Sequence, residues 1–449
     1  MRYLALCTDY DGTLATDGRL LPETIAALER LRASGRRIVL VTGRELDDLQ
    51  SVCSRLDLFD YVVAENGALL YQPSRSAETP LAQRPPDAFV VALRARGIPR
   101  VSVGRVIVAT WEPYELDVLE TIKDQGLELQ VIFNKGAVMI LPAGVNKATG
   151  LTVALTKLGL SPHNAVGIGD AENDHALLAL CECGVAVANA LPRLKETADF
   201  VTTGDHGAGV TELIDAMLRD DLSSHESALT RHHLDIGWDR KEQPLRVRPY
   251  GEHILLLGPP GSHVRRVTSL LNRLAQARYS FCVIDSEGRY GAVQGAVQLG
   301  SDQRPPGVQE ALQALGTAPG GCVINISGAR AEQRTDWIAG LTSGLEEMAR
   351  RSGQPHWVVV EGDDDAVLGP GSVVRVTERP GRLPAGALRS VSLVMAAGPQ
   401  AVGLIEEFGR AAGVVTPHMD PMSLREGEAL ALGSTRWGSG RQLFVVCSV

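Results

Sequence analysis

Acidic residues at two places in this sequence have the types and spacing that phosphate or metal chemistry requires. Asp9 and Asp11 stand two residues apart in DYDGTL (residues 9–14), directly after a short apolar run. One carboxylate of such a pair can attack an electrophile or bind a metal, while the other reaches the same pocket and transfers a proton. GDAEND (residues 169–174) follows another apolar run and places Asp170 at the tip of a predicted strand, with Asn173 and Asp174 one turn further. Oxygen-only ligands of this kind favour Mg²⁺.

Three other segments supply groups that suit phosphate or substrate binding. VTGR (residues 41–44) ends an apolar run with a hydroxyl and backbone N–H groups at a helix start, an arrangement that binds phosphate but alone is equally a simple turn. Lys147 precedes a predicted helix and would bring a positive charge to a phosphoryl oxygen, although a single lysine is usually solvated. Glu65 and Asn66 stand before a glycine and are either substrate contacts or turn residues.

The elements that must position these residues follow a β-α-β pattern over the first 215 or so residues. Apolar residues at spacings of three and four predict a helix over 21–31, between apolar runs at 4–6 and 38–41. Further strands are predicted at 61–64, 165–168, 185–187 and 200–201, with a helix at 151–158. This alternation predicts an α/β fold with a doubly wound parallel sheet, and such sheets bind ligands at their strand ends.

A different pattern interrupts this core between residues 72 and 141. It predicts helix, strand, helix, strand, strand at 87–96, 105–110, 114–125, 129–133 and 137–141. We interpret this stretch as a small inserted α+β module, with the core formed by residues 1–71 and 142–217. Its Trp111, Glu112 and Tyr114 are candidates to point into the site, although an aromatic residue in so small a module more often serves packing.

The second half of the chain begins with a polar stretch and continues as another predicted α/β domain. Residues 218–250 are charged and lack sustained periodicity, which predicts a surface linker. From 251 to 449 the pattern predicts strands at 253–257, 280–285, 322–327, 357–360 and 391–396, and helices at 264–277 and 330–350.

A glycine-rich turn opens this second domain but lacks the residues of a working phosphate loop. The segment LGPPGSHVR (residues 257–265) lies between a predicted strand and a predicted helix, the context of a P-loop. In the GxxxxGK[ST] register from Gly258, the last three positions are His263, Val264 and Arg265. Without the lysine and the hydroxyl, nucleotide phosphates and Mg²⁺ lack their usual partners.

Composition narrows the classes of function. The 449 residues carry a net charge of −9 and only 4% aromatic residues, which disfavours nucleic acids and anionic membranes as partners. The seven cysteines lack paired metal-type spacing, which argues against zinc or redox chemistry. The first residues do not form a signal segment and no apolar run reaches membrane-spanning length, so we expect a cytoplasmic protein.

In their order along the chain, DYDGTL, VTGR, ENGA (residues 65–68), Lys147 and GDAEND resemble the haloacid dehalogenase superfamily of phosphatases, and within it the Cof-type branch. The resemblance covers residues 1 to about 215 and implies a Rossmann-like fold and Mg²⁺ as cofactor. It implies that Asp9 is the nucleophile that forms an aspartyl-phosphate, and that Asp11 is first the acid and then the base.

The same resemblance implies roles for the other motif residues. The phosphoryl group would be held by Thr42 and Lys147. Mg²⁺ would be bound by Asp9, Asp170 and the Asp11 backbone carbonyl, with Asn173 and Asp174 in support. The substrate would be contacted by Gly43, Arg44, Glu65 and Asn66. These roles agree with elementary electrostatics, because a phosphate dianion approaching carboxylates is repelled until cations screen the charge.

The position and size of the inserted module carry a further implication. A module between the second and third motifs is the arrangement of the Cof-type cap, and this one is small, similar to that of archaeal phosphoglycolate phosphatases. We therefore expect a small phosphorylated metabolite as partner, such as a sugar phosphate or phosphoglycolate, hydrolysed as a phosphomonoester. A phosphotransferase that uses the same intermediate remains an alternative, because the aspartyl-phosphate can pass to another hydroxyl.

The second domain resembles HerA-type DNA-pumping ATPases in pattern, on the segments 282–290 and 357–365 with the P-loop-like turn. The domain lacks the lysine and the hydroxyl that ATP hydrolysis requires in a P-loop. The acidic run after Glu361 is also typical of a solvated loop. We interpret it as a degenerate P-loop-like domain that serves as scaffold, regulatory module or the dimerisation surface of a homo-oligomer. A nucleotide-responsive ATPase relative with an accessory phosphatase is the remaining alternative.

Overall fold

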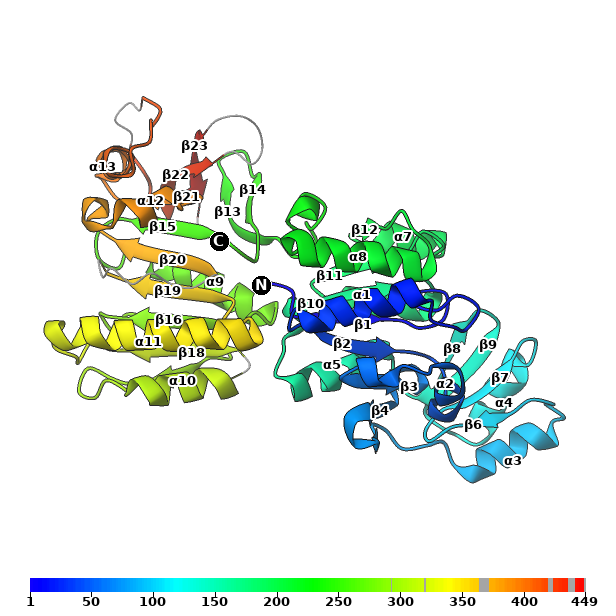
Figure 1. The fold of residues 1–449 in the computed structure, drawn as a ribbon. Helices are drawn as coiled ribbons and strands as arrows, with labels where there is room; N and C mark the ends of the chain where they lie inside the picture. Colours follow the sequence, from blue (N-terminus) through cyan, green and yellow to red (C-terminus); the bar gives the residue numbers. More distant parts are fainter. Residues whose placement is uncertain (292, 319, 363–370, 419–422, 435–440, 448–449) are drawn as a thin grey trace. The chain divides into compact units, whose positions relative to one another are not determined.

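The computed structural model describes residues 1–449 apart from 292, 319, 363–370, 419–422, 435–440 and 448–449 (Figure 1). The described chain divides into two compact units, Met1–Arg231 and His232–Val449. Each unit has its own hydrophobic clusters, and each is described here by itself. Across the described residues, no helix combines the length and the apolar composition that crossing a bilayer requires.

An eight-stranded sheet with the order β12-β11-β10-β1-β2-β3-β4-β5 forms the centre of the first unit. The strands from β12 to β3 run parallel, and β4 and β5 extend the sheet in antiparallel fashion. Their bounds are β1 (Ala5–Thr8), β2 (Arg37–Val41), β3 (Tyr61–Ala64), β4 (Leu69–Gln72), β5 (Ala77–Pro80), β10 (Ala165–Gly169), β11 (Cys183–Ala186) and β12 (Phe200–Val201). The predicted doubly wound parallel sheet is therefore confirmed.

The direction of winding reverses beside β1, because the chain adds β2 and β3 on one side and β10 to β12 on the other. Ligand sites of open α/β sheets lie at such a reversal, outside the carboxyl ends of the strands. The helices are α1 (Pro22–Ala33), α2 (Leu46–Val52), α5 (Lys147–Leu158), α6 (His175–Leu180), α7 (Pro192–Thr197) and α8 (His206–Asp220). In Figure 1, α1 and α8 lie side by side, and α5 packs on β2, β3 and β4.

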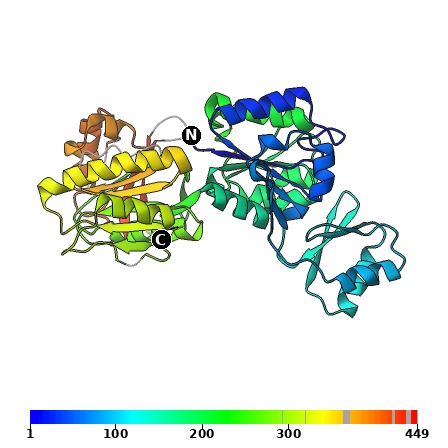
Figure 2. The same ribbon diagram turned by 60° about the horizontal axis from the view of Figure 1, so that its bottom comes forward.

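The inserted module has a small antiparallel sheet of the order β6-β7-β9-β8. Its elements are α3 (Asp87–Ala95), β6 (Ser102–Val103), β7 (Val108–Trp111), α4 (Glu115–Asp124), β8 (Leu129–Asn134) and β9 (Ala137–Pro142). Phe89, Leu93, Val108 and Ile140 belong to its separate core. Figure 2 shows the module as a lobe of its own beside the core sheet. We call it the cap.

The structure places one boundary differently from the sequence prediction. The cap was expected to begin at residue 72, but β5 (Ala77–Pro80) is an edge strand of the core sheet. All four residues of β5 are exposed, so the strand has no buried apolar residues that a periodicity pattern could detect. The chain enters the cap only after this strand.

The second unit contains an eleven-stranded sheet with the order β14-β13-β23-β22-β21-β15-β20-β19-β16-β18-β17. The strands from β21 to β17 in this order run parallel. The strand bounds are β13 (Leu234–Asp239), β14 (Pro244–Val247), β15 (His253–Leu257), β16 (Phe281–Asp285), β17 (Val297–Leu299), β18 (Gly321–Asn325), β19 (Trp357–Glu361), β20 (Ser372–Thr377), β21 (Leu393–Ala396), β22 (Glu428–Ser434) and β23 (Arg441–Cys447). The helices are α9 (Val264–Gln276), α10 (Val308–Thr317), α11 (Ala331–Ser352), α12 (Ala385–Arg389) and α13 (Ala401–Ala412).

The predicted linker requires a correction. Residues 218–250 include the hairpin of β13 and β14, which joins the edge of the second sheet through β23. Leu234 and Ile236 are buried at alternate positions of β13. The alternation spans too few residues, among too many charged neighbours, to stand out in the sequence. Short 3₁₀ helices complete the chain: η1 (Leu56–Leu58), η2 (Glu65–Gly67), η3 (Pro73–Arg75), η4 (Pro162–Asn164), η5 (Glu172–Asp174), η6 (Ser223–His225) and η7 (Pro380–Arg382).

Candidate active site

Asp9 and Lys147 meet at the carboxyl end of β1. Asp9 is the first residue after this strand, and its N–H continues the parallel pairing by donating to the Ile168 carbonyl of β10 at 3.0 Å. Lys147 donates from Nζ to Asp9 Oδ1 and to Asp174 Oδ1, each at 2.6 Å. Both side chains are almost fully buried. The structure thus brings together the predicted nucleophile and the predicted phosphate-binding lysine.

The start of α5 explains how Lys147 reaches this point. Asn146 is the N-cap, and it and Thr149 form a reciprocal capping box that fixes the first turn of the helix. Gly67 has φ +105°, and a Cβ there would lie 1.9 Å from the Asn146 carbonyl oxygen. A Cβ on Gly150 would lie 2.7 Å from Gly67 Cα. The two glycines therefore allow the helix start to approach the η2 turn closely enough to place Lys147.

Asp170 and Asp174 lie in the loop after β10. Thr13 Oγ1 donates to Asp170 Oδ1 at 2.9 Å, which ties this loop to the DYDGTL segment. Asp174 Oδ2 accepts hydrogen bonds from the backbone N–H groups of Asp170 and Ala171 at 2.9 Å. Asp174 therefore contacts Lys147 with one oxygen and shapes the loop with the other.

Burial and like charge set the electrostatics of this cluster. Burial raises the pKa of Asp9 to about 8, with Lys147 opposing the rise and Asp174 and Asp170 adding to it. Burial also raises the pKa of Asp170, against the effect of its hydrogen bond with Lys135. For Lys147, burial alone would lower the pKa, but Asp174 and Asp9 outweigh it and raise the pKa. The raised pKa values of Asp9 and Asp170 show that the ionised acids lack sufficient positive charge around them, so a further cation at this cluster would be favourable.

Asp11 is held by Arg44 rather than by the acid cluster. The Arg44 guanidinium donates to both Asp11 carboxylate oxygens, from Nε at 2.6 Å and from Nη2 at 2.7 Å. The same guanidinium also pairs with Asp48 on α2. Arg44, expected to contact substrate, therefore orients the predicted acid in this structure.

Thr42, Gly43 and Asn66 line the turns after β2 and β3. Thr42 is buried and its Oγ1 accepts from the Arg44 N–H at 3.1 Å. Asn66 is also buried, and its Oδ1 accepts from Asn173 Nδ2 at 3.0 Å. Asn66 Nδ2 and Asn173 Oδ1 have no hydrogen-bond partner among the described residues. Buried polar atoms normally have partners, so this amide pair has hydrogen-bonding capacity left for a ligand.

Glu65 has a different place from the one expected. Its Oε1 accepts from the Arg105 N–H at 2.7 Å, and its Oε2 accepts from the N–H groups of Val106 and Ile107 at 2.7 and 2.8 Å. The side chain is fully buried. Because cap backbone groups occupy both carboxylate oxygens, Glu65 links the core to the cap and is not a substrate contact in this structure.

Two residues of the site had no signal in the sequence. Lys135, in the turn between β8 and β9 of the cap, donates from Nζ to Asp170 Oδ2 at 2.7 Å and to the Asp11 carbonyl at 3.1 Å. Asn189 Nδ2 donates to the Gly12 carbonyl at 2.7 Å. Neither belongs to a motif, so only the folded chain identifies them.

A pocket of about 540 Å³ lies between the core and the cap. Gly43 and Arg44 line it from the core, and Thr110, Trp111 and Met139 line it from the cap. Of the three cap residues suggested by the sequence, Trp111 lines this pocket. Tyr114 packs against the cap core. The backbone N–H of Glu112 donates to the Gly136 carbonyl, and nothing places its side chain in the pocket.

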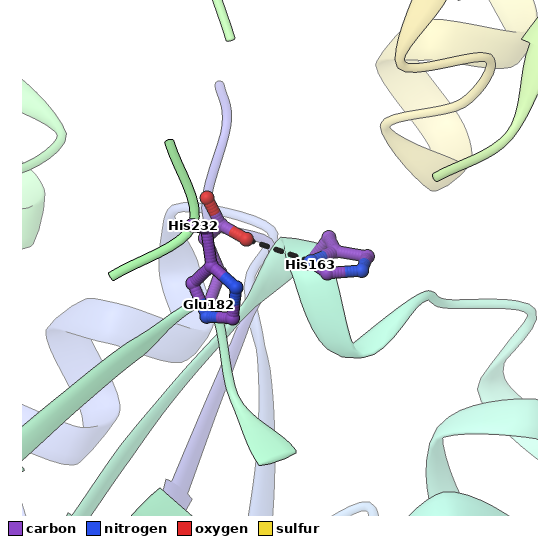
Figure 3. A group of neighbouring side chains, drawn as sticks. All are labelled: His163, Glu182 and His232. Carbon is purple, nitrogen blue, oxygen red and sulfur yellow. Dashed lines mark hydrogen bonds and ion pairs between the residues drawn. The ribbon is translucent and has the colours of Figure 1, made fainter. Parts of the chain in front are cut away.

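A second buried charged group lies at the opposite edge of the sheet, before β10 and β11 begin. His163 Nδ1 lies 2.7 Å from Glu182 Oε2, and Arg2 Nη2 donates to Glu182 Oε1 at 2.5 Å (Figure 3). His232, also drawn in Figure 3, is the first residue of the second unit. Ligands of open α/β sheets bind at the carboxyl ends of the strands, so we interpret Arg2, His163 and Glu182, at the amino ends, as a structural group.

The acid cluster fits a divalent cation. Carboxylate oxygens of Asp9, Asp170 and Asp174 lie within 4.8 Å of one another, and all three residues are buried. Hard oxygen donors of this number and charge suit Mg²⁺ rather than a thiolate- or imidazole-preferring metal. The Lys135 ammonium already approaches one oxygen of this cluster, Asp170 Oδ2, together with the neighbouring Asp11 backbone carbonyl, so positive charge is accommodated there.

In the second unit, a histidine fills the P-loop-like turn after β15. His263 is buried, and burial lowers its pKa to about 4, so the ring is neutral. Its Nε2 lies 2.8 Å from the Leu257 carbonyl and its Nδ1 3.2 Å from Arg266 Nη1, which assigns the proton to Nε2. Glu361 ends β19, 3.5 Å from Arg289 Nη1. The acidic run at 363–365 lies outside the described residues.

With this geometry in view, the chain was compared with known proteins. A family model described as haloacid dehalogenase-like hydrolase matches residues 6–86 and 106–214. Phosphoglycolate phosphatase 2 of Saccharolobus solfataricus is 31% identical over 222 residues, which cover 48% of this chain and 92% of that protein. The chain belongs to the haloacid dehalogenase-like hydrolases. A phosphoglycolate phosphatase of Natronomonas pharaonis is 33% identical and covers 47% of this chain and 96% of its own length.

Membership of the haloacid dehalogenase-like hydrolases confirms the prediction of an enzyme and of a phosphatase. The solved structures that resemble this protein also match about half of its chain. A haloacid dehalogenase-like hydrolase from Bacteroides thetaiotaomicron covers 48% of this chain and 100% of its own, with 19% identity and a TM-score of 0.42. A Thermoplasma acidophilum protein covers 49% and 99%, with 16% identity and a TM-score of 0.43.

Proposed function

We propose that the first unit hydrolyses a small phosphomonoester through an aspartyl-phosphate on Asp9, with Mg²⁺ as cofactor. The observation that carries the proposal is the buried cluster of Asp9, Lys147, Asp170 and Asp174 at the reversal point of the sheet. Similarity to proteins named phosphoglycolate phosphatase supports phosphoglycolate or a small sugar phosphate as the substrate class.

The contacts of Asp9 suit a nucleophile. Lys147 binds Oδ1, while Oδ2 accepts no hydrogen bond from any described residue and is available to attack phosphorus. Attack forms the bond from Asp9 to phosphorus and breaks the bond from phosphorus to the ester oxygen, which leaves as an alkoxide. Lys147 and Thr42 would hold the phosphoryl oxygens, and the unpaired Asn66 Nδ2 is a further donor for the same group.

Asp11 is the residue proposed to move the protons. It would protonate the departing alkoxide, and as a carboxylate it would then take a proton from the water that attacks the aspartyl-phosphate. That second attack breaks the bond from Asp9 to phosphorus and releases inorganic phosphate. Arg44 binds both oxygens of Asp11 in this structure, so we infer that substrate exchanges partners with this pair.

Asp9, Asp170 and the Asp11 backbone carbonyl would hold the Mg²⁺. When bound, the ion would neutralise part of the acid cluster and reduce its repulsion of the phosphate dianion. Asp174 would support this set through its contacts with Lys147 and with the loop backbone.

For the second unit, we propose a degenerate P-loop-like domain without ATP hydrolysis, retained as a scaffold or as a surface for homo-oligomers. The proposal rests on the turn between β15 and α9 and on the parallel order β21-β15-β20-β19-β16. The neutral His263 ring takes the interior of the turn, where a phosphate would require positive charge.

The test is phosphate release from phosphoglycolate, sugar phosphates and nucleoside monophosphates, with and without Mg²⁺, for wild type and Asp9→Asn. We expect metal-dependent release by wild type and a loss of at least about a thousandfold in the variant, because the nucleophile is gone. Circular dichroism checks that the variant is folded. Retained activity in a folded Asp9→Asn protein would refute the aspartyl-phosphate mechanism.

A further inference from the structure

Lys135 is the one cap side chain with a polar contact to the acid cluster among the described residues. It lies in the two-residue turn between β8 and β9, where Lys135 has φ +49° and Gly136 has φ +84°. Positive φ at both central residues is the geometry of a tight hairpin turn. The paired strands, residues 129–134 with 137–142, therefore present this lysine at a defined position.

The oxygens that Lys135 contacts are those that the proposed function assigns to the cation. Its Nζ lies 2.7 Å from Asp170 Oδ2 and 3.1 Å from the Asp11 carbonyl oxygen. A Mg²⁺ ion would need these oxygens at about 2.1 Å. Two cations cannot use the same lone pairs, and they repel each other at such a separation.

The burial of the two partners determines which of them yields. The Asp170 side chain is 3% exposed, whereas the Lys135 side chain is 47% exposed. A half-exposed ammonium can return to water at little cost, because its long stem lets the charge reach solvent. The buried Asp170 carboxylate always needs a counter-charge nearby. Displacement of Lys135 by a divalent cation is therefore the favourable direction of exchange.

We propose that Lys135 is a positioning residue that competes with the divalent cation, so that metal binding releases the β8–β9 turn of the cap from the core. This inference rests on the proposed function, because it uses the same metal oxygens. Competition is reciprocal: the metal loosens the turn, and the docked turn weakens metal binding by the same factor. The cap would thus open for substrate once the core holds its metal.

The test measures metal affinity in the full-length chain by titration calorimetry with Mg²⁺, for wild type and Lys135→Met. We expect Lys135→Met to bind Mg²⁺ roughly fivefold more tightly, at the low end of couplings between linked sites. The matched control is Lys123→Met, which removes an exposed charge from α4 of the same cap. Its affinity should stay within about twofold of wild type, because a distant exposed charge is screened by salt.

Hydrogen exchange supplies the reciprocal readout. In wild type, Mg²⁺ should speed amide exchange at the β8–β9 turn, whereas in Lys135→Met the metal should leave exchange there unchanged. Equal or weaker Mg²⁺ affinity in Lys135→Met, or a turn that Mg²⁺ protects in wild type, would overturn the proposal.

The same experiment distinguishes failure of the proposed function from failure of the role proposed for Lys135. If neither protein binds Mg²⁺, the metal assignment and the competition both fall. If both bind it equally, and Asp170→Asn abolishes binding, the metal site stands and only the role of Lys135 is refuted.

Discussion

Buried charges in the first unit are interdependent at the scale of single residues. Lys147 is buried between Asp9 and Asp174, so removal of Lys147 leaves two buried carboxylates without their counter-charge, and removal of either acid changes the charge balance of the other two. This is why the nucleophile is tested with asparagine, which keeps the size and polarity of the side chain. A truncation to alanine would mix loss of chemistry with loss of fold.

His263 makes the stability of the second unit depend on pH. Burial lowers its pKa to about 4 from the ordinary value of 6.5, so the unfolded chain binds a proton that the folded chain refuses. The part of the free energy of unfolding that depends on neutral His263 is fully present above pH 6.5 and is lost as the pH falls toward 4. Between about pH 7 and about pH 5 we expect a loss of about 2 kcal/mol, at about 1.4 kcal/mol for each pKa unit.

Urea unfolding of wild type and His263→Gln at the two pH values measures this contribution. The variant should lose about 2 kcal/mol less than wild type on acidification, because glutamine keeps a donor for the Leu257 carbonyl but does not titrate. His206→Gln, in the first unit, is the control and should follow wild type. An unchanged pH dependence in His263→Gln would contradict the assignment of a neutral buried ring.

At the scale of elements, the start of α5 depends on Gly67. An alanine there would place Cβ 1.9 Å from the Asn146 carbonyl oxygen, a backbone atom that cannot rotate away. We expect Gly67→Ala to lose at least about 3 kcal/mol of stability. We also expect kcat to fall more than about tenfold, since displacement of α5 moves Lys147 from Asp9.

Gly35→Ala is the matched control for this substitution. Gly35 also has a positive φ, of +88°, but a Cβ there would meet no atom within 4 Å. Gly35→Ala should therefore lower the free energy of unfolding only by the backbone strain, about 1 kcal/mol, and should leave kcat unchanged. Urea unfolding and steady-state kinetics on both variants make the comparison. Equal losses in the two would show that the approach of α5 to the η2 turn is not what places Lys147.

The sequence indicates some elements of the site and not others for physical reasons. Asp9 and Asp170 are visible because each directly follows a fully buried apolar strand, whose end is the functional edge of a parallel sheet. Lys135 could not be predicted because it contacts Asp11 across 124 residues and lies in a two-residue turn that belongs to no motif. Glu65 was assigned to substrate because its motif position does not reveal that the cap backbone covers it.

Similar reasons apply to the second unit. The central strands β15, β16 and β19 are buried along their whole length or nearly so, and their apolar runs were predicted. The β13–β14 hairpin was missed because only Leu234, Ile236 and Val247 of its residues are buried side chains of any size. Edge strands bury one face at most, so their sequences resemble surface loops.

At the scale of the whole molecule, we expect only the first of the two units to have a catalytic centre. We expect full-length Asp9→Asn to release no phosphate from Mg-ATP above background, because His263 stands where a P-loop has charge. The measurement is phosphate release from ATP at saturating Mg²⁺, beside wild type. Hydrolysis by Asp9→Asn that disappears on adding Glu361→Gln would show that the second unit is an ATPase.

The hydrogen bonds of Glu65 also define how the cap can move. One core carboxylate accepts from three consecutive cap amides, those of residues 105–107, at 2.7 to 2.8 Å. Because these bonds hold residues 105–107 to the core, we expect any motion of the cap to be a rotation about this point rather than a separation from the core. Such a rotation moves the hairpin tip at Lys135 while residues 105–107 stay in place. The length of the β8–β9 hairpin would then determine how far its tip moves for a given rotation of the cap. Residues inserted into the hairpin or deleted from it would change this displacement without disturbing the hydrogen bonds of Glu65.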